Sequence, residues 1–152
     1  MPPRHALAST GCRGEWLECE ITESLILRDE LDVHSALAQL SAMGISIAID
    51  DFGTGQSALA YLNRFHVDVL KIDRSFIDGM ERDARKAELT RAFISIAAAL
   101  EMETVAEGIE TEKQAEMLQS FGCLVGQGYL LGRPMPAADF ERGIAGVEAK
   151  RG

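Results

Sequence analysis

The sequence lacks the features that mark several classes of protein. Its three cysteines, Cys12, Cys19 and Cys123, are far apart and form no CxxC pair, a pattern typical of reduced thiols rather than of a disulfide framework. The three histidines are equally scattered, which excludes a histidine-based zinc motif. No apolar run reaches about 18 residues and no signal-peptide pattern opens the chain, so we expect a cytoplasmic location and no membrane span.

Positive charge is also scarce. Fifteen Lys and Arg residues stand against 24 Asp and Glu residues, and the formal net charge is -9. Proteins that coat nucleic acid or anionic membranes need basic surface, so we expect neither DNA nor a membrane as partner. A phosphate-bearing substrate stays compatible with this charge if divalent cations neutralise an acidic site. With 152 residues, 47% of them apolar, the chain can form one domain with a sizeable core.

The most informative stretch is residues 45–55, with the sequence ISIAIDDFGTG. It begins as a run of β-branched and small apolar residues, which is the composition of a strand buried on both faces. The run stops at Asp50 and Asp51, and a Gly-Thr-Gly turn follows. A buried strand that delivers acids at its carboxyl end is typical of a site on a parallel α/β sheet or barrel.

The rest of the chain repeats this alternation after an irregular lead-in over residues 1–14, in which residues 6–9 are compatible with the tail of a helix that Gly11 ends. Strands are expected at residues 16–22, 45–49, 67–73, 104–110 and 123–130. Helices are expected at residues 32–43, 57–64, 83–102, 111–121 and 137–147. Thr111 and Gly122 mark the two ends of the fourth helix. The third helix carries an apolar stripe, formed by Leu89, Phe93, Ile96, Ala97 and Leu100. Successive βα units predict a parallel sheet, in a barrel or a doubly wound arrangement, over a domain of residues 15–147 with a tail at 148–152.

Acidic side chains recur at the predicted strand ends, which parallel strands would gather at one rim. They are Glu20, Glu23, Asp50, Asp51, Asp73, Glu107 and Glu110. Lys71 is the one cation expected beside them. Crowded carboxylates repel one another, and Mg²⁺ or Mn²⁺ would relieve that repulsion through oxygen ligands. Each residue also has a simpler interpretation as a helix cap, a solvated strand end or a salt-bridge partner.

Five segments carry a resemblance to a known family. They read ECEITES (18–24), IDDFGTG (49–55), LKIDRSF (70–76), AEGIET (106–111) and QGYL (127–130), the last followed by Arg133 and Pro134. These segments resemble EAL domains, bacterial phosphodiesterases that linearise the second messenger cyclic di-GMP, over about residues 6 to 142. The resemblance implies an α/β fold, a partial (β/α)8 TIM-like barrel with about five parallel strands, and metal-dependent hydrolysis of cyclic di-GMP to linear pGpG.

The resemblance also implies a metal site with Mg²⁺ or Mn²⁺ as cofactor. Glu20 and Asp50 match metal ligands, and Asp51 matches a ligand that bridges to a second metal. Glu107 matches a further carboxylate of the metal site, with a second possible role as a base. A metal-bound water beside a phosphodiester is a nucleophile at neutral pH, so this assignment agrees with the chemistry of the residues.

The remaining matched residues have supporting or catalytic roles in the family. Lys71 matches the group that helps to activate the attacking water, and Gln127 matches a residue that contacts the water or the substrate. Glu23 matches the glutamate that holds the loop of residues 51–55, which is tied to substrate binding and dimerisation. Asp73 and Glu110 are expected to support the site.

Two motifs of the family are not in this sequence. The Glu-Ala-Leu strand that supplies a ligand glutamate is absent, and so is the second strand with its ligand asparagine. A complete barrel takes about 250 residues. We therefore expect a fragment, a mis-assigned gene start or a truncated remnant, with weak or no activity alone. The implied partners are a homodimer mate and an upstream sensory or GGDEF domain. The alternative is a degenerate, non-catalytic EAL module that binds cyclic di-GMP or a partner protein.

Overall fold

The computed structural model describes residues 3–27, 31–53 and 65–148. The helices are α1 (Pro3–Thr10), α2 (Glu23–Leu27), α3 (Leu31–Ser41), α5 (Arg74–Ile77), α6 (Ala84–Ala99), α7 (Glu112–Phe121) and α8 (Ala137–Glu148), with a 3-10 turn at Gly14–Trp16. The strands are β1 (Glu18–Thr22), β2 (Ser46–Phe52), β3 (Val69–Ile72), β4 (Glu103–Glu107) and β5 (Val125–Gln127).

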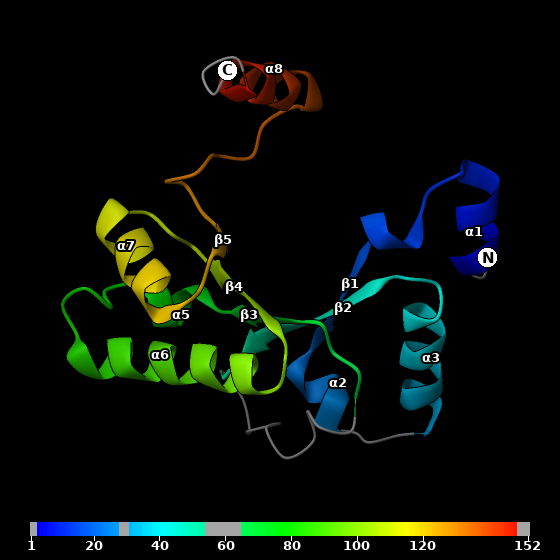
Figure 1. The fold of residues 1–152 in the computed structure, drawn as a ribbon, viewed down its shortest axis with the longest axis horizontal. Coiled ribbons are helices and arrows are strands. Elements are labelled where there is room, and N and C mark those ends of the chain that lie inside the picture. Colours follow the sequence, from blue (N-terminus) through cyan, green and yellow to red (C-terminus); the bar gives the residue numbers. More distant parts are fainter. Residues whose placement is uncertain (1–2, 28–30, 54–64, 149–152) are drawn as a thin grey trace.

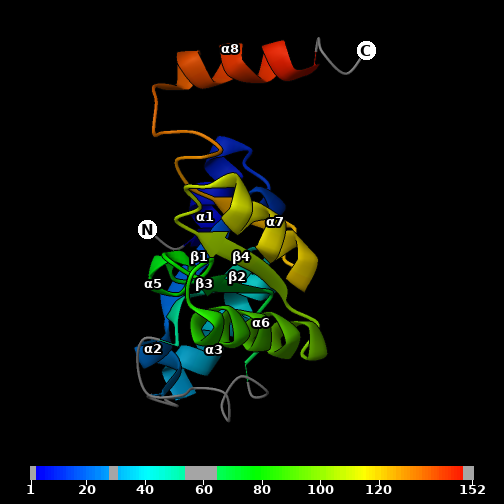
Figure 2. The same ribbon diagram turned by 90° about the vertical axis from the view of Figure 1, so that its left-hand side faces the viewer.

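The five strands form one parallel sheet in the order β1-β2-β3-β4-β5, which confirms the predicted α/β alternation. Helices α2, α3 and α6 lie along the same side of this sheet, and α8 stands apart from it at the end of an extended segment (Figure 1). A view turned by 90° shows the same separation of α8 (Figure 2). Every strand therefore points its carboxyl end toward the same edge of the sheet.

The two faces of the sheet differ in chemistry because side chains alternate along each strand. Ile21, Ile49, Leu70 and Thr104 are partners in register and lie on the face that the helices cover. Ile49 and Leu70 are fully buried there and belong to the hydrophobic core. The neighbouring positions of each strand, including Lys71, face the other way and carry most of the polar groups.

Strand β2 passes through an irregularity where the sequence places its two carboxylates. The pairing with β3 shifts between Ile49 and Phe52, and Asp51 has a φ of 55°. Asp50 faces away from the core by the normal alternation after Ile49. The extra residue at Asp51 then reverses the alternation, so that Phe52 returns to the core and is 1% exposed. The prediction that the strand stops at the carboxylates was wrong, because the bulge lets the strand continue to Phe52.

Several other boundaries differ from the sequence-based expectations. In the lead-in, the helix expected at residues 6–9 is longer than predicted, because α1 spans Pro3–Thr10; it is followed, as expected, by Gly11, which has a φ of 69°. Strand β5 is limited to three residues. A short helix, α5, was not expected; Asp73 caps it by accepting a hydrogen bond from the Ser75 amide. The helix predicted at 57–64 lies outside the described residues.

The apolar stripe of α6 is only partly as predicted. Phe93 packs against the core and Ala97 is fully buried, but Leu89 is 44% exposed. Thr90 and Ile94 are buried in its place. Thr90 was missed because its hydroxyl is satisfied locally, by the carbonyls of Lys86 and Phe76, and a hydroxyl with such partners can be buried at little cost. In the part of the chain that the structure describes, no helix is both long and apolar enough to cross a bilayer.

Candidate active site

Lys71 lies among three carboxylates that come from three other strands. Its Nζ atom is 2.5 Å from Oε1 of Glu20 on β1 and 2.8 Å from Oε1 of Glu107 on β4. Oδ1 of Asp50 on β2 is 3.4 Å away. The Lys71 side chain is only 7% exposed, although it is charged. We call these four residues the Lys71 cluster.

The cluster keeps Lys71 protonated. Burial would lower the pKa of a lysine, but hydrogen bonds to Glu107 and Glu20, together with the charges of Glu107 and Asp50, outweigh it and raise the pKa well above its usual value. Three carboxylates and one ammonium leave a formal charge of about -2 at this end of the sheet. The site therefore has an excess of negative charge that a cationic ligand would neutralise.

Gln127 extends the cluster to the edge strand. Its Nε2 donates a hydrogen bond to Oε1 of Glu107 at 2.8 Å, so this carboxylate oxygen accepts from both Gln127 and Lys71. Gln127 and Glu107 are partners in the β4–β5 register, which explains their contact. The structure thus brings together five of the residues that the sequence singled out, one from each strand.

The other predicted residues lie near the same edge but have different partners. Oε2 of the buried Glu23 accepts a hydrogen bond from the Gly53 amide at 3.3 Å, which agrees with a role in holding the segment after β2. Asp51 is exposed on the bulge, and its amide donates to Oδ1 of Asp50. Asp73 caps α5, and its hydrogen bonds with Ser75 lower the pKa of its carboxyl despite partial burial.

Sequence reasoning missed a second cation at this edge. Nη2 of Arg74 lies 2.6 Å from Oε1 of Glu110, so Glu110 is ion-paired outside the Lys71 cluster. Lys71 is therefore not the one cation near the acids, contrary to the prediction. The sequence did contain a signal for this cation, because Arg74 directly follows Asp73 at the predicted end of a strand.

The donor chemistry of the cluster fits a hard divalent cation, since Glu20, Asp50 and Glu107 offer carboxylate oxygens alone. The spacing of these carboxylates is not that of a preformed metal site. Among the residues that the structure describes, no three Asp, Glu, His or Cys side chains lie as metal ligands do. Lys71 is at the centre of the acids instead, and a cation would compete with its ammonium group for the same oxygens.

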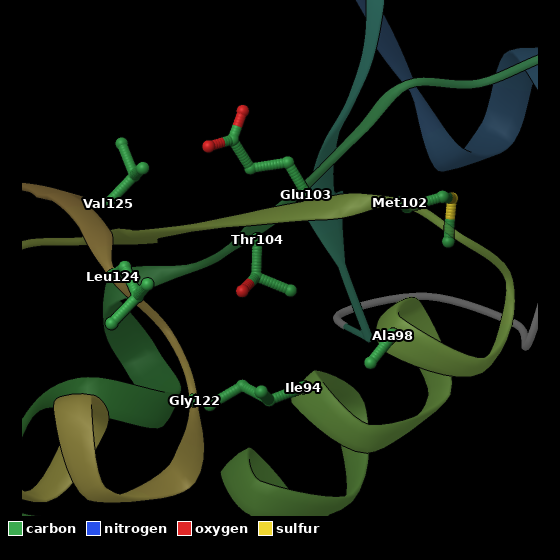
Figure 3. Close-up of a pocket in the computed structure, with 8 residues that line it drawn as sticks. All are labelled: Ile94, Ala98, Met102, Glu103, Thr104, Gly122, Leu124 and Val125. Carbon is green, nitrogen blue, oxygen red and sulfur yellow. The ribbon is translucent and has the colours of Figure 1, made fainter.

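A cavity of about 150 Å³ lies elsewhere, between α6 and the starts of β4 and β5 (Figure 3). Thr104 and Glu103 line it from β4, and Ile94 lines it from α6. Glu103 is the first residue of β4, whereas Glu107 is the last. The cavity is therefore at the opposite end of the sheet from the Lys71 cluster and has no part in the candidate active site.

The fold and the cluster define a class: an α/β protein whose acidic site lies at the carboxyl ends of parallel strands, as in TIM-like barrels. Comparison with known families makes this specific. The model of the EAL domain matches residues 3–134. The chain belongs to the EAL domain family.

Two curated relatives come from Pseudomonas aeruginosa. The bifunctional diguanylate cyclase/cyclic di-GMP phosphodiesterase MucR is 45% identical over 142 residues, which is 93% of this chain and 21% of MucR. The cyclic di-GMP phosphodiesterase NbdA is 43% identical over 138 residues, 91% of this chain and 18% of NbdA. The chain thus spans about a fifth of the length of the curated relatives it matches.

Solved structures give the same fold. The MucR phosphodiesterase of P. aeruginosa in complex with cyclic di-GMP superimposes with a TM-score of 0.84 and 46% identity, over 90% of this chain and 56% of that one. BlrP1 of Klebsiella pneumoniae, solved with manganese and cyclic di-GMP, gives a TM-score of 0.78 and 32% identity over 86% of this chain and 33% of that one. A calcium complex of BlrP1 also matches. The partial TIM-like barrel predicted from the sequence is confirmed.

Proposed function

We propose that this chain provides the strand-end residues of a cyclic di-GMP phosphodiesterase, which hydrolyses the cyclic dinucleotide to linear pGpG with Mg²⁺ or Mn²⁺. The observation that carries the proposal is the Lys71 cluster. Residues separated by up to 87 positions in the sequence, from Glu20 to Glu107, contact one ammonium group. Family membership and relatives that act on cyclic di-GMP support the same reaction.

The proposed cofactor would be held by carboxylates of the cluster. Glu20, Asp50 and Glu107 would be its ligands, and Asp51 would bridge to a second ion from the bulge. A bound divalent cation would supply a deprotonated water at neutral pH and would stabilise charge on the phosphate. The manganese complex of BlrP1 supports a divalent ion in this family.

The chain's own residues would orient the reaction. Lys71 is buried, protonated and hydrogen-bonded to two carboxylates, so its ammonium is held in a fixed position. There it would orient the attacking water and stabilise negative charge that develops on the phosphate. Gln127, bonded to Glu107, would contact the water or the substrate.

A non-catalytic role is the second candidate. Without a ready cation cage in the described residues, the cluster could serve a module that binds cyclic di-GMP, or a partner protein, without cleaving it. The two functions differ in product. A binding module would retain the nucleotide intact, whereas the enzyme would release pGpG.

The experiment is incubation with cyclic di-GMP and Mn²⁺, followed by separation of the nucleotides. It should use this chain and, in parallel, an extended version that carries any residues encoded in frame upstream of Met1. We expect pGpG from the extended version and little or none from this chain. Binding of cyclic di-GMP by the extended version without cleavage would refute the enzyme and favour the binding module.

Site variants decide whether the cluster carries the activity. In the extended version, Asp50→Asn and Lys71→Met should each lower the rate of pGpG formation by at least about 100-fold while the protein stays folded. Lys86→Met is a matched control, since Lys86 on α6 donates to the Asp78 carbonyl away from the cluster. Full activity of Asp50→Asn would remove Asp50 from the site.

A further inference from the structure

The turn that follows β4 connects directly to the Lys71 cluster. Gly108 comes immediately after Glu107 and has a φ of 72°, in the left-handed region that favours glycine. A Cβ atom on Gly108 would lie 2.4 Å from Cγ of Arg74. The aliphatic part of Arg74 therefore lies across the backbone of this turn, and no side chain fits between the two.

The head of Arg74 is bonded to the same turn. Its Nη2 pairs with Oε1 of Glu110 at 2.6 Å, two residues after Gly108. Arg74 is the first residue of α5, whose start is fixed by the Asp73 cap. Arg74 thus contacts the turn twice, by its stem and by its guanidinium, from a helix that begins just after the strand of Lys71.

The other side of the turn is bonded to the strand of Gln127. The amide of Ile109 donates to the Gln127 carbonyl, and the Ile109 carbonyl accepts from the Leu130 amide. A Cβ atom on Gly128 would lie 2.2 Å from the Ile109 carbonyl oxygen, so the two backbones are in close contact. A displacement of the turn would therefore move Gln127 as well as Glu107.

The ion pair itself adds little to stability, because Arg74 is 57% exposed and Glu110 is 42% exposed. Stability of the turn has a separate, buried source. The Gln114 side chain accepts from the amides of Glu110 and Thr111 and donates to the Ile77 carbonyl of α5. The Arg74–Glu110 pair is thus suited to fix the position of the turn, whereas the buried bonds of Gln114 supply most of the turn's stability.

We propose that Arg74 and Glu110 are positioning residues, which clamp the turn after β4 and so hold Glu107 and Gln127 in the geometry of the Lys71 cluster. This inference rests on the proposed function for its consequence, which is tighter binding of a divalent cation. The clamp itself is a property of the fold and can be tested without any metal.

The first measurement is amide hydrogen exchange by NMR without metal. Arg74→Gln should speed exchange at the amides of Ile109 and Leu130 at least about 5-fold, because both bonds depend on the position of the turn. The matched control is Arg91→Gln, since Arg91 pairs with Glu88 at the same 2.6 Å and with similar exposure on α6. Unchanged exchange in Arg74→Gln overturns the clamp, whatever the metal does.

The second measurement is the affinity for Mn²⁺, from the EPR signal of the free ion. Arg74→Gln and Glu110→Gln should each weaken binding about 10-fold, the loss typical of groups that orient a metal ligand. Arg91→Gln should bind like the unmodified chain. The charge-swapped pair, Arg74→Glu with Glu110→Arg, should recover part of the loss, which a general effect on stability would not produce.

The two measurements separate the two proposals. If the unmodified chain binds Mn²⁺ and Arg74→Gln binds it equally well, the positioning role is refuted. If the unmodified chain binds no Mn²⁺ but Arg74→Gln still speeds exchange at Ile109, the metal site of the proposed function is refuted and the clamp stands.

Discussion

The Nζ atom of Lys71 lies 2.8 Å from Oε1 of Glu107, the last residue of the neighbouring strand. Lys71 and Glu107 are not partners in register; Lys71 pairs with Val105, two residues earlier. The contact therefore depends on the length of the lysine, which reaches along the sheet toward the strand ends. Its ammonium group contacts the same carboxylates that would hold a metal ion.

This geometry predicts that Lys71 competes with a divalent cation for the carboxylates, in addition to the catalytic role proposed above. Lys71→Met keeps an unbranched side chain that is one atom shorter, and it removes the charge. We expect tighter Mn²⁺ binding, because three carboxylates then lack their internal counter-ion, together with loss of any hydrolysis. Titration of Mn²⁺ followed by EPR measures the first effect.

The same substitution should destabilise the metal-free chain. The cost should be about 2 kcal/mol, less than for a fully buried ion pair because Glu20 is 49% exposed. Mn²⁺ should raise the melting temperature of Lys71→Met more than it raises that of the unmodified chain. Weaker Mn²⁺ binding by this variant would show that Lys71 supports the metal rather than competing with it.

Glu23 should affect binding of the nucleotide more than binding of the metal. Its carboxylate accepts from the Gly53 amide, at the end of the bulged strand, and is 4% exposed. Glu23→Ala should weaken cyclic di-GMP binding about 10-fold, since removal of a buried acceptor releases this segment. Mn²⁺ binding should weaken less, because Glu23 holds the segment of Asp51 and not the Lys71 cluster. Isothermal titration measures both. Glu23→Gln, which keeps an acceptor oxygen, should lose less.

Asp73 gives a prediction that depends on pH. The pKa of its carboxyl is lowered by the hydrogen bonds with Ser75. Its ionised form therefore stabilises the fold above about pH 4, and this contribution is lost as the pH falls through the folded-state pKa. Asp73→Ala should cost about 1 kcal/mol at pH 7 and less at pH 3, in urea unfolding. An equal cost at both values would exclude the ionised cap.

The turn after β4 should tolerate no side chain at Gly108. Gly79 is the matched control, because it has a similar φ of 76° but nothing within 4 Å of its Cβ position. Gly79→Ala should cost about 1 kcal/mol from backbone strain alone. Gly108→Ala should cost about 1–3 kcal/mol more, because it meets Arg74. Adding Arg74→Ala to Gly108→Ala should recover part of the difference.

Much of the fold followed from the sequence because the signals were local. Alternation between helix and strand predicted the parallel sheet, and the carboxyl ends of parallel strands share one edge by geometry alone. Thr111 and Gly122 marked the ends of α7, which the structure confirms with a capping box and a left-handed residue. The presence of a cation among the acids was also readable from Lys71 in an apolar strand.

Other features depended on the tertiary structure. Whether seven acids form one cluster or several was not fixed by their positions at strand ends, because the bulge leaves Asp51 exposed outside the cluster that Asp50 joins. The pairing of Arg74 with Glu110 joins residues 36 positions apart, and no local pattern specifies it.

The sequence by itself therefore determined the alternation of strands and helices, the family and the edge of the sheet at which the acids gather. Only the tertiary structure decided which acids share the Lys71 ammonium and which are held by other partners. The physical reason is range: hydrogen bonding along the chain and hydrophobic periodicity act within a few residues, whereas ion pairs depend on how separate elements pack.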